Sequence, residues 1–563
     1  MLGGGNREAT TRGKPDTLEA GYAALKRGRA EDARAIFAAL VDDHGSAEAQ
    51  EGLSWATLAL DDGDATIAAR QAAYRLYHAA GAPVAAARMA MWLAKDHDDF
   101  RGEAALANGW LARARRLLVD QPLAPEHGWL PILECWGTTA SERDPKDVEK
   151  GARHAMEVAR ACGDRDLELL GIGFEGLALV DAGQIEDGMA RLDEAAAAAT
   201  AGELDEPLWA LVVFCNLIFA CERVRDFARA AEWCATMRDQ ADRMRHVGSQ
   251  GICRARFGAV LTQSGDWAGA EDALAAAVRC FDASWPPYRA EALADLAELR
   301  RRQGRLGEAA ALLEEAAGTP RTALVQARCA LDLGQGAEAV ASAERYLRRF
   351  PETSALLRVE GLEVLTRAAV AVGQVQRAED ALGELEAIAR KVATLPLLAM
   401  ARAARAALAA STGRTETARA GFEDAIDLFA RAGMAFDAAA ARVDLGELLA
   451  LDRPEAARGE AASALAALNA MGATHLARRA AALEARIARS LQGGARDGPP
   501  EALTPRQAQV LRHVAAGLTN REIAAELSLS EKTVDRHLSN AFDRLGVSSR
   551  AAAAALAVER GLI

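Results

Sequence analysis

Apolar and polar residues alternate along residues 17–490 with the period of an amphipathic α-helix, and short polar or glycine-containing segments interrupt this pattern at regular intervals. Residues 503–563 show the same helical period with punctuation of their own, and no βα pattern is found. The pattern therefore predicts an all-α chain, in which a long helical array is followed by a small second helical domain.

The array contains a repeated spacing: a glycine, a small residue five positions later and usually a larger apolar residue nine positions later. Complete copies are Gly28 with Ala33 and Phe37, Gly102 with Ala107 and Leu111, Gly183 with Gly188 and Leu192, Gly265 with Ala270 and Leu274, Gly373 with Ala378 and Leu382, and Gly413 with Ala418 and Phe422. Partial copies are Gly63 with Ala68, Gly304 with Ala309, Gly334 with Ala339, Arg225 with Ala230, Asp452 with Ala457, and a weak one near Asp147 and Ala152. From Gly28 to Asp452 they take eleven steps over 424 residues, about 39 residues per step.

Each position of the repeat has a physical role. The glycine can end one helix in a left-handed cap. The small residue suits a close crossing of two helices, and the larger apolar residue fills the gap between neighbouring hairpins. Each unit is thus a helix pair that buries its apolar face only by stacking on its neighbours.

This spacing resembles the tetratricopeptide repeat, and residues 265–270 are the best local match. The period of that repeat is about 34 residues, so the longer period here leaves the superhelical pitch and any ligand groove open. The resemblance implies a tetratricopeptide-like solenoid of about 11–12 helical hairpins that acts as a binding or oligomerisation scaffold. A plain helical spacer is the alternative.

The charge of the chain divides unevenly. In total, 67 Lys and Arg residues face 80 Asp and Glu residues, a net charge of −13 that argues against binding to nucleic acid if it is spread evenly. Residues 501–563, however, hold 8 basic and 7 acidic residues, which leaves 59 basic and 73 acidic residues, a charge of −14, on residues 1–500. The acidity belongs to the array, and a domain of charge +1 needs a dimer or a partner to bind DNA tightly.

The composition between the two helical regions indicates a linker. Residues 493–500 hold three glycines and two prolines and break the helical period. We therefore predict a flexible tail at 1–16, the repeat array at 17–490, a flexible linker at 491–502 and a second domain at 503–563.

The second domain has the punctuation of a helix-turn-helix. Thr504 with Gln507 and Thr519 with Glu522 have the spacing of capping boxes, and Ser530 can cap the third helix. Gly517 and Gly546 are expected to end helices, and the third helix has apolar residues at Val534, Leu538, Ala541 and Leu545. A fourth helix is predicted at about 549–560. Two short helices, a tight turn and a longer helix with a polar outer face can place side chains in the major groove.

These residues resemble the LuxR-type (GerE/NarL-like) DNA-binding domain over nearly its full length. The matching stretches are LTPR at 503–506, GLTNREIA at 517–524, KTV at 532–534 with His537, LGV at 545–547 and SR at 549–550. The resemblance implies that the third helix enters the major groove and that the fourth contributes to a homodimer.

The same resemblance implies a set of contact residues. Those expected to face bases are Asp535, Arg536 and Ser539, and those expected to face phosphates are Thr519, Asn520, Lys532, Thr533, His537 and Asn540. Arg536 is the strongest candidate for a base contact. Asp535 either accepts a hydrogen bond from a cytosine amino group or forms a salt bridge with Arg536 or Arg506. His537 can pack at the helix margin, donate to a phosphate, or do both.

Other kinds of site lack a motif. The eight cysteines form no Cys-x-x-Cys pair, no P-loop occurs, and the glycine pattern at 171–176 lies in a helical repeat. We expect no enzyme activity, no cofactor and no metal. The N-terminus has no secretory signal, and the apolar segment at 209–221 is shorter than the about 20 residues that span a bilayer. It is expected to be a buried helix, so the sequence predicts a cytoplasmic protein with no membrane segment.

Together these features predict a DNA-binding transcriptional regulator. Its helix-turn-helix would bind a promoter operator in double-stranded DNA, and its array would bind an unknown protein or small-molecule effector or mediate oligomerisation. The alternative is a protein-interaction adaptor whose helix-turn-helix serves docking or dimerisation.

Overall fold

The structure is a computed structural model that describes residues 17–136, 142–244, 247–316, 318–493, 503–547, 549–559 and 561. The predicted tail at 1–16 and residues 494–502 of the predicted linker lie outside this part of the chain. The described residues are helical and contain no strand, which confirms the all-α prediction. They form two units, residues 1–481 and 482–563, and the division falls within helix α25.

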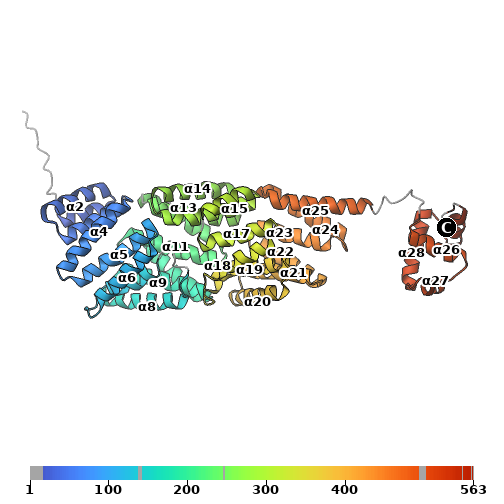
Figure 1. The fold of residues 1–563 in the computed structure, drawn as a ribbon, viewed down its shortest axis with the longest axis horizontal. Helices are drawn as coiled ribbons and strands as arrows, with labels where there is room; N and C mark the ends of the chain where they lie inside the picture. Colours follow the sequence, from blue (N-terminus) through green and yellow to red (C-terminus); the bar gives the residue numbers. More distant parts are fainter. Residues whose placement is uncertain are drawn as a thin grey trace, which may run out of the picture. The chain divides into compact units, whose positions relative to one another are not determined.

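The array consists of twelve helix pairs and a final helix within the described residues (Figure 1). The first seven pairs are α1 (Leu18–Lys26), α2 (Ala30–His44), α3 (Ala47–Leu58), α4 (Gly63–Ala79), α5 (Pro83–Arg101), α6 (Ala104–Leu118), α7 (Glu126–Glu134), α8 (Pro145–Cys162), α9 (Arg165–Asp181), α10 (Ile185–Ala201), α11 (Pro207–Val224), α12 (Phe227–Met244), α13 (Val247–Ser264) and α14 (Trp267–Ala283). A short 3-10 helix, η2 (Pro286–Tyr288), follows α14. The remaining helices of the array are α15 (Arg289–Gln303), α16 (Leu306–Glu315), α17 (Pro320–Asp332), α18 (Gly336–Leu347), α19 (Ala355–Ala371), α20 (Val375–Val392), α21 (Leu395–Ser411), α22 (Thr415–Arg431), α23 (Ala435–Leu449), α24 (Pro454–Met471) and α25 (Thr474–Gly493).

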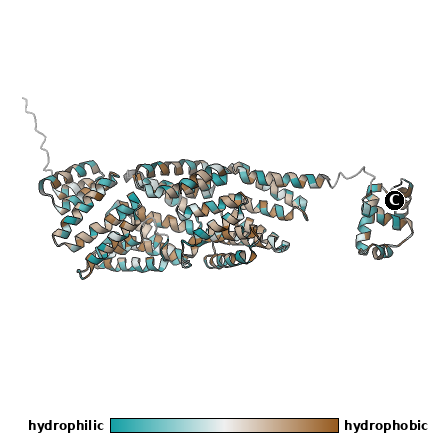
Figure 2. Ribbon diagram, in the orientation of Figure 1, coloured by the Kyte–Doolittle hydropathy of each residue, from teal (hydrophilic) through white to brown (hydrophobic). Residues whose placement is uncertain are grey.

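Hydrophilic and hydrophobic residues alternate along most helices of the array (Figure 2). The repeat spacing places the second helix of each pair. Eight of its nine glycines lie two residues before such a helix with φ between 66° and 96°, the left-handed conformation that glycine adopts most easily. Gly63 is the exception. It is the first residue of α4, and Asp61 takes the left-handed position with φ 58°.

This correction shifts the register of the second pair. Counting five positions from Asp61 leads to the fully buried Thr66, whereas the predicted Ala68 is exposed. The weak copy near Asp147 is also out of register, because that residue lies inside α8 rather than in the preceding turn. Sequence spacing alone could not separate a glycine at the cap from one at the start of the next helix.

The small residues of the repeat lie at close helix crossings, as predicted. A Cβ atom added to Gly188 of α10 would lie 2.6 Å from the carbonyl oxygen of Gly176 in α9. The larger apolar residue fills the space between helices: a Cβ atom at Gly21 or Gly52 would lie 2.4 or 2.2 Å from the ring of Phe37. The glycines at 171–176 lie in α9, where Gly176 allows the close approach of Gly188 in α10. The apolar segment 209–221 lies in α11, which is buried.

The array coils tightly enough for successive superhelical turns to touch. The Asp61 carboxylate accepts hydrogen bonds from the backbone of Val247 at 2.7 Å and from Ser284 Oγ at 2.9 Å. Further along, Lys391 donates to the Ala182 carbonyl and Thr474 to the Gln303 carbonyl. These partners are 171 to 223 residues apart in sequence, so one turn takes about five repeats of about 39 residues. The pitch that the sequence left open is thus set by contacts between turns.

The second unit contains the predicted four-helix domain. Its helices are α26 (Pro505–Ala515), α27 (Asn520–Glu526), α28 (Glu531–Leu545) and α29 (Arg550–Glu559). They surround a separate apolar core whose buried members include Val510, Leu511, Ile523, Val534 and Leu538. No helix in the described part of the chain is long and apolar enough to cross a membrane.

Candidate nucleic-acid interface

The two short helices of the domain begin at reciprocal caps. Thr504 accepts from the Gln507 backbone N–H, and the Gln507 side chain accepts from Thr504; Thr519 and Glu522 form the same capping box. The hydrogen bond from the Thr519 backbone holds the pKa of Glu522 below its usual value. Both predicted boxes are confirmed, and they fix where α26 and α27 start.

A tight turn connects α27 to α28. Ser528 adopts a left-handed φ of 53°, the Leu529 N–H donates to the Ala524 carbonyl at 2.8 Å, and Ser530 caps α28 through the Thr533 N–H. The αL cap at Gly546 ends α28. This local geometry produces a helix-turn-helix in which α28 is the helix that follows the turn.

One side of α28 packs into the core of the domain, and the opposite side is exposed to solvent. Val534, Leu538, Ala541 and Leu545 are buried in the domain core, as predicted. The opposite side is exposed at Lys532, Asp535, Arg536, Ser539 and Asn540. Within the described residues, the side chains of Lys532, Arg536 and Ser539 make no hydrogen bond or ion pair. Their polar groups are therefore available to a ligand without breaking an internal contact.

The Asp535 carboxylate pairs with a side-chain amide of the domain. Its carboxylate accepts a hydrogen bond from the side-chain amide of Asn520, and Arg506 instead donates to Gln509 and to the Leu527 carbonyl. No ion pair between Asp535 and Arg536 or Arg506 occurs in the described structure. Reading of a cytosine by the second carboxylate oxygen stays a prediction.

Asn520 forms a brace between three helices. Its amide nitrogen donates to Asp535 of α28, and its amide oxygen accepts from Arg550 Nη1 of α29 at 2.6 Å. Arg550 also donates to the Leu518 carbonyl. Both ends of the Asn520 amide are thus used inside the domain, which fits a positioning role at least as well as the predicted phosphate contact.

The other residues expected to contact phosphate lie around the exposed side of α28. The Thr519 hydroxyl donates to Glu522 at 2.8 Å, and the Thr533 hydroxyl pairs with Ser530 at 2.7 Å. His537 is half-buried at the margin of the helix, and Asn540 is exposed. Sequence reasoning matched Arg550 to the family but missed its link to Asn520, because a bond across 30 residues leaves no periodic signal.

The fourth helix carries an exposed apolar face. Ala551, Ala555 and Val558 are exposed at helical spacing on α29, and the Val558 side chain is 59% accessible. Ala553 and Ala557 point instead into the core. The helix is therefore apolar on both sides, which is unusual for a helix that meets only water.

Among the described residues, no group of three or more His, Cys, Asp or Glu side chains could hold a metal ion. The eight cysteines, all within the described residues, form no disulfide with one another, and five of them are buried.

Solved structures similar to the chain are helical-repeat proteins. They include yeast Tom70 (13% identity, TM-score 0.31, covering 77% of this chain and 96% of that one) and a Rap protein complexed with competence and sporulation factor (14%, 0.44, 65% and 99%). A third is the Cut9–Hcn1 hetero-tetramer of the APC/C (12%, 0.40, 82% and 95%).

Residues 501–557 match the family model "Bacterial regulatory proteins, luxR family". A nitrate/nitrite response regulator protein homolog of Haemophilus influenzae is 47% identical over 64 residues, 11% of this chain and 31% of that protein. The probable transcriptional regulatory protein SgaR of Hyphomicrobium methylovorum is 50% identical over 60 residues (11% and 28%), and NarP of Escherichia coli is 42% identical over 67 residues (12% and 31%). The chain thus spans about a third of the length of these relatives. The second unit contains a LuxR-type helix-turn-helix domain.

Proposed function

We propose that the protein is a bacterial, cytoplasmic transcription regulator that binds a promoter operator through α28. The observation that carries this proposal is the exposed side of α28, where Arg536, Ser539 and Lys532 have no internal partner within a domain of the LuxR type. Such long polar side chains on a recognition helix reach base edges in the major groove. The relatives of this domain are transcription regulators, and their names support the same role.

In this proposal the contacts divide by chemistry. Arg536 and Ser539 face bases, and Asp535, held by Asn520, presents its second oxygen to a cytosine amino group. Lys532, Thr519, Thr533, His537 and Asn540 face phosphates, which fix the register of the helix on the duplex. The protein binds as a homodimer through the apolar face of α29, and the array receives a protein or small-molecule effector.

Selection from a random double-stranded DNA pool tests the proposal. We expect both the full chain and residues 503–563 to enrich a defined sequence, and the affinity to fall steeply as salt rises because phosphate contacts release counterions. If neither form enriches a sequence, the protein is an adaptor and its helix-turn-helix is a docking module. A difference between the two forms would measure the influence of the array.

Replacing Arg536 by alanine should cost about 1–3 kcal/mol of binding free energy on the selected operator and relax the preference at one base position. The reason is the loss of the bidentate donor that the free guanidinium offers to a guanine. Titrations of the variant against all four bases at each position would show this as a flat profile at a single position.

Arg512→Ala is the matched control, because Arg512 is exposed on α26 and its loss changes the charge of the domain equally. It should reduce affinity for all sequences alike, if at all. Equal specificity profiles for wild-type and Arg536→Ala proteins would show that another side of the domain reads the DNA.

A further inference from the structure

A cavity of about 550 Å³ lies inside the first superhelical turns of the array. Its walls come mainly from the first helices of successive pairs, including α9, α11, α13, α15 and α19. This volume is within the range of about 300–1,000 Å³ that is typical of small-molecule sites. The cavity belongs entirely to the array and is independent of the DNA-binding surface.

Contacts between superhelical turns close the chain into a ring around this cavity. Asp61 accepts hydrogen bonds from Val247 and Ser284, and the Tyr288 hydroxyl donates to Asp99 at 2.8 Å. The rings of Phe100 and Trp285 also meet edge to face with their centroids 6.4 Å apart. A folded domain has no room inside such a ring, so the occupant that fits is a small molecule.

One end of the cavity has aromatic walls. Trp55, Trp92, Trp136, Trp209 and Trp285 all line it. Trp92 and Trp209 are stacked with centroids 5.8 Å apart and an angle of 12° between their planes, and Trp136 meets Trp209 edge to face at 5.7 Å. Five of the nine tryptophans of the chain thus line the cavity and are called the tryptophan wall below. Arg70 lies over the rings of Trp55 and Trp92, and Lys95 lies over those of Trp136 and Trp285. The aromatic surface that lines the cavity favours a flat aromatic ligand.

The charges of the lining cancel. The described residues around the cavity include eight Lys or Arg side chains and eight Asp or Glu side chains. At the aromatic end, Arg70 pairs with Asp96 at 2.6 Å and Lys95 pairs with Asp99. Burial raises the pKa of Asp96 to about 6, which is still below neutral pH, so at pH 7 its carboxylate balances the charge of Arg70.

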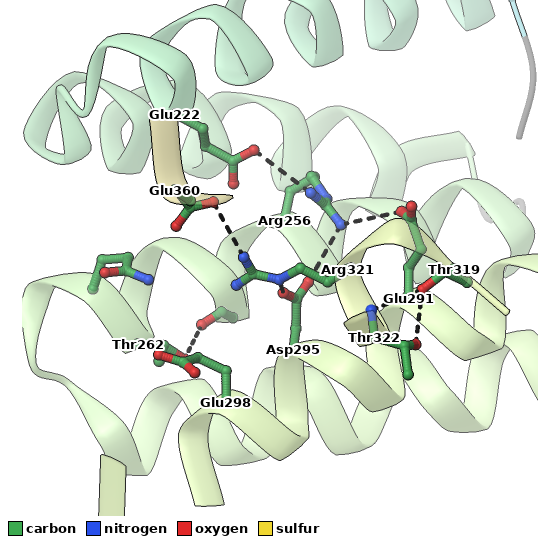
Figure 3. A network of polar contacts seen from close by, with 12 residues as sticks. Glu222, Arg256, Thr262, Glu291, Asp295, Glu298, Thr319, Arg321, Thr322 and Glu360 are labelled. Carbon is green, nitrogen blue, oxygen red and sulfur yellow. Dashed lines mark hydrogen bonds and ion pairs between the residues drawn. The ribbon is translucent and has the colours of Figure 1, made fainter. Parts of the chain in front are cut away.

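The same balance holds at the other end (Figure 3). The Arg256 guanidinium lies among Glu222, Glu291 and Asp295 at 3.4–3.7 Å. Arg321 joins Asp295, at 2.7 Å, to Glu360, at 3.5 Å. Although burial raises the pKa of Glu360, the surrounding guanidinium groups hold it well below its usual value, so the carboxylate stays ionised and paired.

A ligand with a net charge would disturb this balance. Its charge would enter a partly buried site in which the existing charges already satisfy one another, and its desolvation would have no compensating partner. An uncharged ligand avoids this penalty and still gains from stacking on the tryptophans.

Two buried donors in the lining, Arg70 Nη2 and Asn216 Nδ2, lack a hydrogen-bond partner in the described structure. The Asn216 side chain of α11 is 5% exposed, and its Nδ2 atom makes no hydrogen bond in the described structure. Asn216 lines the cavity, and a Cβ atom added to the neighbouring Gly173 would lie 3.5 Å from this nitrogen, an ordinary contact distance. A buried amide N–H without an acceptor is unfavourable, so an acceptor on a ligand would be bound preferentially here.

We propose that the cavity binds an uncharged aromatic molecule with a carbonyl or similar acceptor, which stacks on the tryptophan wall and accepts a hydrogen bond from Asn216. Such a molecule would be the effector in the proposed function. Its role as an effector rests on that function, but its binding to the cavity does not. Binding is measured on the full chain without DNA, so the two ideas fail separately.

Three fluorescent naphthalenes serve as probes. N-phenyl-1-naphthylamine is uncharged, 8-anilinonaphthalene-1-sulfonate is nearly the same skeleton with an anionic group, and Prodan is an uncharged naphthalene with a ketone. We expect saturable binding of both uncharged probes, with one site per chain and energy transfer from the tryptophans, and at least tenfold weaker binding of the sulfonate. Equal or tighter binding of the sulfonate, or no saturable binding of the uncharged probes, would overturn the proposal.

Two variants locate the site. Asn216→Leu removes the donor at similar size and should weaken Prodan binding about tenfold, as for loss of one buried hydrogen bond, while N-phenyl-1-naphthylamine changes less than twofold. Asn108→Leu, the same change at an exposed position of α6, is its control. Ala259→Phe fills the cavity from α13 and should abolish binding of both probes, whereas Ala268→Phe on the exposed side of α14 should not.

Circular dichroism checks that each variant keeps its helices. If Asn216→Leu does not fold, Ala259→Phe still decides the question. Unchanged probe binding in a folded Ala259→Phe protein would place the probes elsewhere and refute the cavity as the site.

Discussion

Replacement of Glu298 by glutamine is expected to lower the free energy of unfolding of the array by about 3–5 kcal/mol at neutral pH, the usual effect of breaking a buried ion pair on one side. Glu298 lies on α15 with its side chain 1% exposed. Its two carboxylate oxygens accept hydrogen bonds from Arg301 at 2.8 and 2.9 Å and from Arg302 at 2.9 Å. A neutral amide would remove the carboxylate that both guanidinium groups share and would leave Arg301 with Asp332 at 2.6 Å and Arg302 with Asp437 at 3.8 Å.

The destabilisation caused by Glu298→Gln should decrease at acidic pH. Burial alone would raise the pKa of Glu298, but Arg301, Arg328 and Arg302 hold it well below its usual value. A carboxylate whose pKa is depressed in the folded state stabilises the fold above its unfolded pKa, about 4.3. The difference between wild-type and Glu298→Gln proteins should therefore be constant from neutral pH down to about pH 5 and shrink as the pH falls below about 4.

Urea unfolding, followed by the circular dichroism of the helices at several pH values, measures the loss of unfolding free energy and its dependence on pH. Glu423→Gln is the matched control, because Glu423 also pairs with an arginine, Arg419, but is 49% exposed. Exposed pairs contribute about 0–1 kcal/mol, so this control should unfold near the wild-type midpoint. If Glu298→Gln is as stable as the control, the surrounding arginines relax toward solvent and the buried network does not hold the array together.

Local features of the fold could be predicted because they depend on neighbours in sequence. The spacing of Gly183, Gly188 and Leu192 specifies a cap, a close crossing and a buried contact within one helix pair, and the structure confirms all three. The capping boxes at Thr504 and Thr519 are equally local. The error at Gly63 shows the limit, because Asp61 adopts the left-handed conformation that the pattern assigns to a glycine. Its carboxylate has partners 186 and 223 residues away, and these are not visible in the sequence.

The cavity and the details of the DNA-binding face could not be predicted for the same reason. Trp92 and Trp209 belong to helices that are several repeats apart in sequence, and Asp99 and Tyr288 meet only after the array has completed a superhelical turn. Whether Asp535 would pair with an arginine or with Asn520 depended on how α27 and α28 cross. Residue types and helical faces were readable, but partners across elements required the structure.

The second large effect concerns the proposed dimer. Val558→Asp should convert the protein from dimer to monomer and weaken operator binding about 100-fold or more, because two linked half-sites gain this much over one. A carboxylate on the exposed apolar face of α29 would be buried unpaired in a symmetric interface. The loss should be large because a domain of charge +1 has little electrostatic attraction to DNA of its own.

Analytical ultracentrifugation and titration of a two-half-site operator against a single half-site separate the two consequences. The Val558→Asp variant should bind the single half-site almost as well as the wild-type protein does. It should lose only the gain in affinity that a second half-site gives to a dimer. Val558→Lys distinguishes burial from charge, because it adds a cation that favours DNA and should still dissociate the dimer. Val119→Asp, at an equally exposed position (58%) in the array, should change neither property. A Val558→Asp protein that remains dimeric and binds the full operator normally would assign dimerisation to the array instead of α29.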